Sequence, residues 1–288
     1  MQFPKKAEII EVGPRDGLQN EPGPITVEQK KELIRRLADT GLSRMETASF
    51  VNPKWVPQMA DAEEIAAWCN HLGITWIALT PNVKAVERAI AAKAPQIAVF
   101  VGASTAFNKK NINKSTEESL QECKQIFETA KSQGIFVRAY ISMAFSCPYQ
   151  GKVTFEEVER VCRSFVDLGA DEIDVADTNG FANPKQVYER FSRLRELFPE
   201  AVFVGHFHDT RKMALANTLA AMQAGVEKFD SSIGGLGGCP FSPGATGNLA
   251  TEDLLLMLNE MGIDTGVSLD NLLEHVPFAK SLSAGWNG

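Results

Sequence analysis

Residues 136–176, FVRAYISMAFSCPYQGKVTFEEVERVCRSFVDLGADEIDVA, decide the fold. A largely apolar run (136–142) is followed by a segment with apolar residues at helical spacing (154–168), and a second apolar run (172–176) comes next. Gly169 lies between the helical segment and the second run, where a helix C-cap favours glycine. We therefore predict a strand, a crossover helix and a second strand parallel to the first.

The same unit repeats along the chain in both directions. Further strands are predicted at 7–12, 44–48, 75–80, 96–101, 202–207 and 228–231, and further helices at 26–39, 57–72, 83–92, 115–133, 183–198, 213–224, 251–261 and 269–282. Eight such units are typical of an α/β fold of the closed (β/α)8 TIM-barrel type, whose active site lies at the C-terminal ends of the strands. An open doubly wound sheet is the alternative. We expect a single barrel domain over 1–288 with an extra C-terminal helix.

The composition argues against several classes of protein. The net charge of −7 argues against a general nucleic-acid binder. The chain has no apolar run of about 18 residues, so no membrane span is expected. Its five cysteines show no CxxC spacing, which favours free thiols in a reducing cytoplasm. The first residues lack the apolar run of a signal peptide, which agrees with a cytoplasmic location.

Polar residues gather where the predicted strands end, and barrel closure makes the first and eighth strands neighbours. They are Arg15 and Asp16 after the first strand, Glu46 near the end of the second, Asp177 after the sixth, His206 and His208 at the end of the seventh, and Cys239 and Asn248 after the eighth. These side chains are therefore expected to converge on one mouth of the barrel.

His206 and His208 are two apart in a strand, so their side chains point to the same face. With the Asp16 carboxylate and the Asn248 amide oxygen they would offer two nitrogen and two oxygen ligands. Such a set, with open positions left for substrate, suits six-coordinate Mg²⁺ or Mn²⁺ better than a closed zinc site. The alternative is a hydrogen-bonded pair of core histidines.

Arg15 and Cys239 are the candidate catalytic groups. Arg15 keeps its proton at working pH and could hold an anionic oxygen that develops during reaction. A structural pair with Glu46 is the alternative, and both can hold. Cys239 lies in 234–248, GGLGGCPFSPGATGN, where the glycines predict a backbone that bends tightly and approaches a neighbour closely. A thiol in that loop could transfer a proton, whereas the other four cysteines are expected to pack as small hydrophobes.

A lysine-rich segment, 109–114, follows the fourth strand. Lys109 and Lys110, with Asn111 beside them, would lie at the same rim and could meet ligand phosphates. The alternative is an ordinary solvated loop.

Three stretches resemble the 3-hydroxy-3-methylglutaryl-CoA lyase family. They are 13–21 (GPRDGLQNE), Glu46 with 47–51 (TASFV), and 235–240 (GLGGCP), and the likeness runs from about residue 9 to 275. The Arg-Asp-Gly start is shared by a wider group of metal-dependent (β/α)8 lyases and synthases. The other motifs are more specific to the lyase.

The resemblance implies cleavage of 3-hydroxy-3-methylglutaryl-CoA to acetyl-CoA and acetoacetate, usually in leucine degradation, with an acyl-CoA thioester as substrate and Mg²⁺ or Mn²⁺ as cofactor. We also expect a homo-oligomer, either a dimer or a tetramer. The implied roles are metal ligation for Asp16, His206, His208 and Asn248, enolate stabilisation for Arg15, proton transfer for Cys239 and His206, supporting acids for Asp177 and Glu46, and CoA binding for Asn111, Lys109 and Lys110.

Two positions depart from the family pattern. Lys212 stands where glycine is expected, and Asn179 stands where isoleucine is usual. Neither departure removes a predicted ligand. The rival interpretations are a synthase or aldolase of the same barrel group, and a metal-stabilised barrel that only binds.

Overall fold

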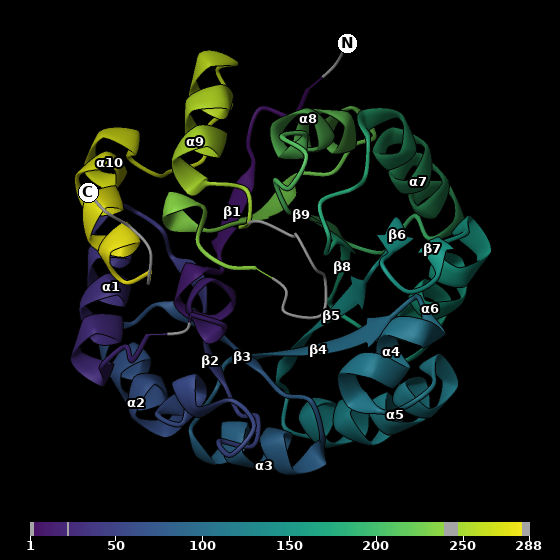
Figure 1. Cartoon of the computed structure of the whole chain (residues 1–288), viewed down its shortest axis with the longest axis horizontal. Coiled ribbons are helices and arrows are strands. Elements are labelled where there is room, and N and C mark those ends of the chain that lie inside the picture. Colours follow the sequence, from purple (N-terminus) through teal and green to yellow (C-terminus); the bar gives the residue numbers. More distant parts are fainter. Residues whose placement is uncertain (1–2, 22, 239–246, 284–288) are drawn as a thin grey trace.

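The computed structural model describes residues 3–21, 23–238 and 247–283. Eight parallel strands form a closed barrel in the order β1-β10-β9-β8-β5-β4-β3-β2 (Figure 1). The strands are β1 (Glu8–Glu11), β2 (Arg44–Ser49), β3 (Thr75–Leu79), β4 (Gln96–Gly102), β5 (Phe136–Ser142), β8 (Glu172–Asp177), β9 (Phe203–Phe207) and β10 (Lys228–Ser231). The predicted TIM barrel is therefore confirmed.

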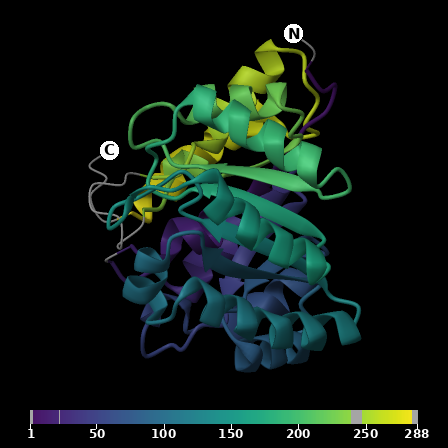
Figure 2. The same ribbon diagram turned by 90° about the vertical axis from the view of Figure 1, so that its right-hand side faces the viewer.

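Helices form an outer ring around the strands, as the views along and across the barrel show (Figures 1 and 2). They are α1 (Val27–Asp39), α2 (Ala62–Leu72), α3 (Val83–Ala91), α4 (Thr105–Ile112), α5 (Thr116–Ser132), α6 (Phe155–Asp167), α7 (Pro184–Leu197), α8 (Ala214–Gln223), α9 (Thr251–Glu260) and α10 (Leu269–Ser281). The predicted extra C-terminal helix corresponds to α10, which packs beside α1.

Local sequence signals set the helix ends. Thr26, the predicted N-cap of α1, accepts a hydrogen bond from the backbone of Gln29 at its side chain, and the Gln29 side chain accepts one from the Thr26 backbone. The glycines predicted to end helices all adopt positive φ, a conformation that costs glycine little. They are Gly41, Gly73, Gly134, Gly169 and Gly225.

Several elements differ from the sequence prediction. The helix predicted from residue 57 is a 3-10 turn, η2 (Pro57–Met59), followed by the separate α2. A small antiparallel hairpin of β6 (Ser146–Cys147) and β7 (Gly151–Lys152) follows β5. The lysine-rich segment lies in and just after the helix α4 rather than in a loop. Ser104 caps that helix, and the Asn108 side chain ties it to Gly102 at the end of β4.

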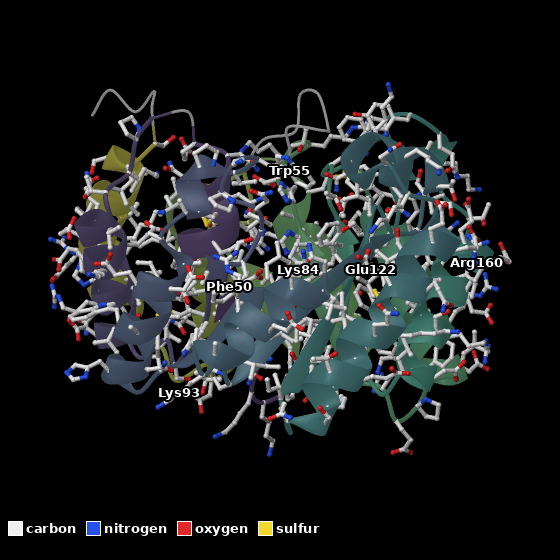
Figure 3. The ribbon with its side chains drawn as sticks, turned by 90° about the horizontal axis from the view of Figure 1, so that it is seen from below. Phe50, Trp55, Lys84, Lys93, Glu122 and Arg160 are labelled. Atoms are coloured by element: carbon white, nitrogen blue, oxygen red, sulfur yellow. The ribbon has the colours of Figure 1, made fainter. Side chains whose placement is uncertain are left out.

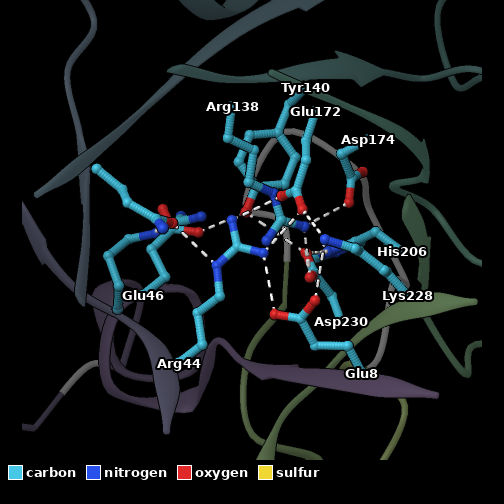
Figure 4. Close-up of polar contacts among 12 residues, drawn as sticks. Glu8, Arg44, Glu46, Arg138, Tyr140, Glu172, Asp174, His206, Lys228 and Asp230 are labelled. Atoms are coloured by element: carbon cyan, nitrogen blue, oxygen red, sulfur yellow. Dashed lines mark hydrogen bonds and ion pairs between the residues drawn. The ribbon is translucent and has the colours of Figure 1, made fainter. Parts of the chain in front are cut away.

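The barrel interior is divided chemically. One part is apolar and includes Ile10, Ile77 and Leu79, which is the usual filling of such barrels. The other part carries charged side chains from β2, β5, β8 and β10, joined by hydrogen bonds and ion pairs (Figure 4). A buried charge needs a partner, and these side chains supply one another's partners inside the barrel.

Figure 3 shows the barrel from the side. Trp55, which is 82% exposed, lies toward the end where the strands finish, and Lys93 lies at the opposite end. Across the described ranges, no helix combines the length and apolar character that crossing a membrane would need.

Candidate active site

The first strand delivers two site residues through one turn of π-helix, η1 (Gly13–Gly17). The Val12 carbonyl accepts hydrogen bonds from the backbone of Arg15 (3.2 Å), Asp16 (2.7 Å) and Gly17 (3.2 Å). The sequence placed these residues after the first strand but assigned no regular element to them. Single π-turns are often found at functional sites, and this one holds Arg15 and Asp16 side by side at the C-terminal mouth.

Arg15 is 6% exposed and joins two carboxylates. Its Nε donates to Glu46 Oε1 at 2.7 Å and its Nη1 donates to Asp16 Oδ1 at 2.8 Å. Glu46 Oε2 in turn accepts a hydrogen bond from the Tyr140 hydroxyl at 2.5 Å. The predicted pairing of Arg15 with Glu46 is therefore present, and it fixes the guanidinium at the edge of the mouth.

Asp16, His206 and His208 bring one potential ligand atom each within 4.8 Å of one another. The two imidazole rings lie 5.3 Å apart between centroids. Burial opposes ionisation of Asp16, but the charges of Arg15 and the two histidines outweigh it and lower its pKa to about 2. Asp16 is thus a carboxylate at neutral pH, as a metal ligand must be.

Asn248 joins this group from the far end of the chain. It pairs with His208 in an antiparallel β-bridge, and its Nδ2 donates to Asp16 Oδ2 at 2.8 Å and to the Leu236 carbonyl at 3.0 Å. The segment around Asn248 is therefore held against the end of β9. The carboxylate, the imidazoles and the nearby amide form a hard, mixed oxygen and nitrogen donor set, which fits Mg²⁺ or Mn²⁺.

Close backbone packing explains two glycines of the 234–248 stretch. A Cβ on Gly237, whose φ is +104°, would lie 2.7 Å from Asn248 Nδ2 and 3.1 Å from the Asp16 carbonyl oxygen. A Cβ on Gly247 would lie only 1.7 Å from the Gly235 carbonyl oxygen. The predicted close approach of this backbone is confirmed. Gly237 approaches the turn that carries Asp16, and Gly247 approaches Gly235 of the same stretch.

Glu11 links the loops that follow β1 and β10. Its Oε1 accepts hydrogen bonds from the backbone of Gly13 at 2.7 Å and Ile233 at 3.1 Å, and its Oε2 accepts one from the Thr251 hydroxyl at 2.7 Å. Desolvation raises its pKa to about 7, although these hydrogen bonds partly oppose the rise. No pattern in the sequence identifies this buried carboxyl.

His206 has a partner behind the site. Its Nδ1 lies 2.9 Å from Asp230 Oδ2, and its ring meets that of Tyr140 edge-on at 6.1 Å (Figure 4). Burial opposes the charged ring, but the hydrogen bond to Asp230 and the charges of Asp174, Asp230 and Asp16 raise the pKa of His206 to about 9. The side chains that raise this pKa are thus all aspartates.

Sequence reasoning missed four of the residues beneath the site. Each is a buried polar side chain within a barrel strand, where apolar residues are the usual filling, and this is the signal that could have identified them. They are Arg138 and Tyr140 in β5, Asp174 in β8 and Asp230 in β10.

Asp177 was also predicted to support the site, but it lies outside this cluster of ligand atoms. Asp177 ends β8, but its two oxygens accept backbone hydrogen bonds from Phe181 at 3.1 Å and Ala182 at 3.0 Å. Desolvation raises its pKa to about 6. Both oxygens thus fix the turn after β8.

Lys109, Lys110 and Asn111 lie near the end of α4. Lys109 makes an exposed ion pair with Glu118 at 3.1 Å, and Lys110 is exposed. Cys239 lies outside the described residues, so its predicted role stays a prediction. The other four cysteines are free and buried, as expected.

The two departures from the family pattern have local explanations. Lys212 has a φ of +57°, a left-handed conformation that glycine adopts at lower cost. Asn179 is buried and accepts a hydrogen bond at its Oδ1 from the Ser146 hydroxyl at 3.0 Å, which ties the turn after β8 to the β6–β7 hairpin.

Comparison with known proteins agrees with this geometry. The profile of the HMGL-like family matches residues 6–277. The chain is 48% identical over 273 residues to the mitochondrial hydroxymethylglutaryl-CoA lyase of Homo sapiens, covering 94% of this chain and 84% of that protein.

Two solved structures are also similar. The HMG-CoA lyase of Bacillus subtilis superposes with a TM-score of 0.93 at 45% identity, covering 98% of this chain and 95% of that one. An HMG-CoA lyase from Acinetobacter baumannii, solved in complex with coenzyme A and 3-methylmalate, gives 0.91 at 38% identity, covering 98% and 92%. The chain belongs to the HMGL-like family.

Proposed function

We propose that this protein is a hydroxymethylglutaryl-CoA lyase, which cleaves 3-hydroxy-3-methylglutaryl-CoA to acetyl-CoA and acetoacetate. The observation that carries the proposal is the convergence of Asp16, His206 and His208 beside a fixed Arg15 at the C-terminal mouth. The extensive identity to named lyases gives the substrate.

The reaction is a retro-Claisen cleavage, and its atoms balance without an oxidant or a reductant. The tertiary hydroxyl loses its proton, and its oxygen becomes the ketone of acetoacetate as the C2–C3 bond breaks. The electron pair of that bond passes to C2 and forms the enolate of acetyl-CoA. A proton then adds to C2. The enzyme must therefore accept one proton, stabilise an enolate oxygen and supply one proton.

Asp16, His206, His208 and Asn248 are proposed to bind Mg²⁺ or Mn²⁺. A divalent cation bound there supplies Lewis acidity and orients the hydroxyl and carboxylate oxygens of the substrate. The preference between the two ions is not set by this donor set, which suits both.

Arg15 is proposed to stabilise the enolate oxygen of acetyl-CoA. Its guanidinium is permanently charged and buried, and Glu46 and Asp16 hold it in one orientation. A cation that is already oriented needs little reorganisation when negative charge develops on the thioester oxygen. The Tyr140 hydroxyl supports this arrangement from the far side of Glu46.

His206 has one ring nitrogen for the reaction, because Nδ1 is in contact with Asp230. The remaining nitrogen, Nε2, either ligates the cation or takes up the hydroxyl proton. Cys239 is proposed to deliver the proton to C2, because its thiol lies in the segment between Gly237 and Asn248, whose ends pack beside Asp16. Asp177 supports the site indirectly through the turn that it holds.

The end of α4 is proposed to bind the CoA moiety. Lys109 and Lys110 are exposed cations, and Asn111 adds an amide that can donate or accept hydrogen bonds. Exposed lysines meet phosphates as point charges, so this contact should add affinity for the thioester rather than rate. A cytoplasmic setting, a role in leucine degradation and a homo-oligomeric state complete the proposal.

Purified protein with Mg²⁺ or Mn²⁺ should release acetoacetate from 3-hydroxy-3-methylglutaryl-CoA. The release should stop after chelation of the metal and return when Mn²⁺ is restored. A panel of related 3-hydroxyacyl-CoA thioesters measures the acyl preference in the same assay. Failure to release acetoacetate with any divalent metal would refute the lyase proposal.

The role of Cys239 is tested with Cys239→Ala and with Cys147→Ala as the control for removal of a thiol, because Cys147 is a free cysteine buried away from the ligand group. Cys239→Ala should lose at least about 100-fold in kcat, the usual scale for a proton-transfer group, while Mn²⁺ binding stays unchanged. Full turnover in Cys239→Ala would remove the thiol from the mechanism.

A further inference from the structure

We infer that Asp230, held by Arg138, is a positioning residue that keeps a proton on Nδ1 of His206 and so leaves Nε2 as the ring nitrogen that serves the site. The contact itself follows from the barrel. Asp230 and His206 are register partners on the neighbouring strands β10 and β9. Side chains at paired positions point to the same side of the sheet, and here Asp230 Oδ2 lies 2.9 Å from His206 Nδ1.

The direction of this hydrogen bond follows from the other contacts of Asp230. Its Oδ1 accepts a hydrogen bond from Arg138 Nη2 at 2.5 Å, and its Oδ2 also lies 3.4 Å from the Tyr140 hydroxyl. Arg138 cannot lose its proton in a protein and its side chain is fully buried. Asp230 beside it is therefore an ionised carboxylate, which can only accept hydrogen bonds. The proton between Asp230 and His206 must then belong to Nδ1.

The ring of His206 is also fixed in orientation. The edge-on contact with Tyr140, at an interplanar angle of 88°, packs one side of the imidazole. Tyr140 itself is held by its hydroxyl on Glu46. A flip of the ring would break the Asp230 contact inside a buried site, which is costly. Nε2 thus remains the nitrogen available to the group of Asp16 and His208.

The same residues could instead be interpreted as a second cation site, because Asp174, His206 and Asp230 bring one potential ligand atom each within 4.8 Å of one another. Arg138 excludes this interpretation. Its guanidinium binds Asp174 Oδ2 at 2.8 Å and Asp230 Oδ1 at 2.5 Å, so a permanent positive charge already lies between the two carboxyl groups. A divalent ion there would face strong repulsion.

The inference rests on the proposed function only for the use of Nε2, since an unprotonated Nε2 is needed both to ligate a cation and to accept a proton. The position of the proton can be measured without any reaction. The chain has four histidines, so a long-range ¹H–¹⁵N spectrum of the metal-free protein at pH 10 can be assigned with single His→Ala variants. Neutral His206 should show a protonated Nδ1.

Asp230→Asn tests the cause of this tautomer. Asparagine is close in size, but its amide can donate to Nδ1, so the proton should move to Nε2. Mn²⁺ binding, followed at pH 8 by electron paramagnetic resonance of free Mn²⁺, should weaken about 10- to 100-fold. The matched control is Asp174→Asn, because Asp174 binds the same Arg138 but not the imidazole. Its His206 spectrum should stay that of the wild type and its Mn²⁺ affinity within about threefold.

Three results would overturn the inference. They are a wild-type His206 with its proton on Nε2, an Asp230→Asn protein that keeps the wild-type spectrum, and equal changes in both variants. The wild-type spectrum is decisive even if Asp230→Asn fails to fold. Because the spectrum needs neither metal nor substrate, a failed acetoacetate assay would leave this inference standing, and the reverse also holds.

Discussion

Both mouths of the barrel carry charged side chains, but the arrangement of the charges differs between them. At the N-terminal mouth, Arg44 binds Glu172 through two hydrogen bonds of 2.8 and 2.6 Å, and Lys228 bridges Glu172 and Glu8 at 2.6 and 3.0 Å (Figure 4). Each charge there has an opposite charge as its partner. At the C-terminal mouth, Asp16, His206 and His208 gather ligand atoms around one point.

The difference shows that a hollow alone does not identify the functional site in this barrel. Hollows of about 400 and 300 Å³ lie at the N-terminal mouth and share Glu8 and Lys228 in their walls. A ligand there would have to break ion pairs that are already complete. A cation at the other mouth would instead meet a carboxylate, two imidazoles and a nearby amide. Convergent donor atoms distinguish the functional end.

The largest expected effect is at the C-terminal mouth. His208→Ala should weaken Mn²⁺ binding by at least about 100-fold and lower kcat by at least about 10³-fold, because loss of the cation removes several kcal/mol of transition-state stabilisation. Acetoacetate release and Mn²⁺ titration measure the two quantities.

His206→Ala distinguishes between two possible roles of His206. Equal loss of Mn²⁺ affinity in both variants would make His206 a ligand, whereas near wild-type affinity with lost turnover would make it a proton-transfer residue. A His208→Ala protein that binds Mn²⁺ normally would contradict the proposed ligand set.

At the N-terminal mouth, Arg44→Met should act on stability and leave the chemistry unchanged. The change leaves Glu172, whose side chain is 1% exposed, without its two hydrogen bonds from Arg44. Breaking one side of a buried pair costs about 3–5 kcal/mol. Urea unfolding should show this loss, while kcat of the folded protein stays within about threefold. A drop in kcat comparable to that of His208→Ala would mean that the two mouths are coupled.

Glu11 gives a smaller, pH-dependent effect. Its pKa is raised to about 7 from an ordinary value of 4.5, so the folded state binds the proton more tightly. Its stabilising contribution is complete below about pH 4.5 and is lost as the pH rises through about 7. The loss is at most about 3 kcal/mol, at 1.4 kcal/mol for each pH unit.

Urea unfolding of the wild type and of Glu11→Gln at pH 5 and pH 8 isolates this contribution. Glutamine keeps an acceptor for Gly13 and Ile233 but does not titrate. The wild type should lose more stability than the variant between the two pH values. Parallel changes in both proteins would assign the pH dependence to other groups.

The smallest effect is expected at the rim. Lys110→Ala should raise KM for the CoA thioester about two- to fivefold without changing kcat, because an exposed charge contact contributes up to about 1 kcal/mol. The increase should shrink at high salt. Lys93→Ala is the control, since Lys93 is an exposed lysine at the other end of the barrel (Figure 3). Equal KM changes in both variants would exclude a local phosphate contact.

Periodicity predicted the eight strands and nearly all of the helices, because each element has its own pattern of apolar residues. The helix α4 was missed because its position depends on the Asn108 side chain, which hydrogen-bonds Gly102 at the end of β4. The π-turn at 13–17 was missed for a similar reason. Its glycines and proline suggest a loop, and only the packing of Gly17 against Leu236 selects the observed turn.

The ligand group could be predicted because strand ends of a barrel must converge. The supporting residues Asp230 and Tyr140 lie inside strands where apolar residues are the rule, so their polarity could have identified them. Their partners could not be predicted, because His206 in β9, Arg138 in β5 and Glu46 in β2 are brought together only by the fold. The glycines of 234–248 were correctly expected to allow close approach, but the partners of Gly237 and Gly247 became known only from the fold.

The contact between Asp16 and Asn248 spans 232 positions of sequence. During synthesis the first of these residues leaves the ribosome long before the second, so the proposed cation site cannot be assembled until residue 248 has been made. Chains stalled before residue 248 should therefore bind Mn²⁺ weakly, which ribosome-released fragments can test. Metal retention would then report that synthesis has passed residue 248.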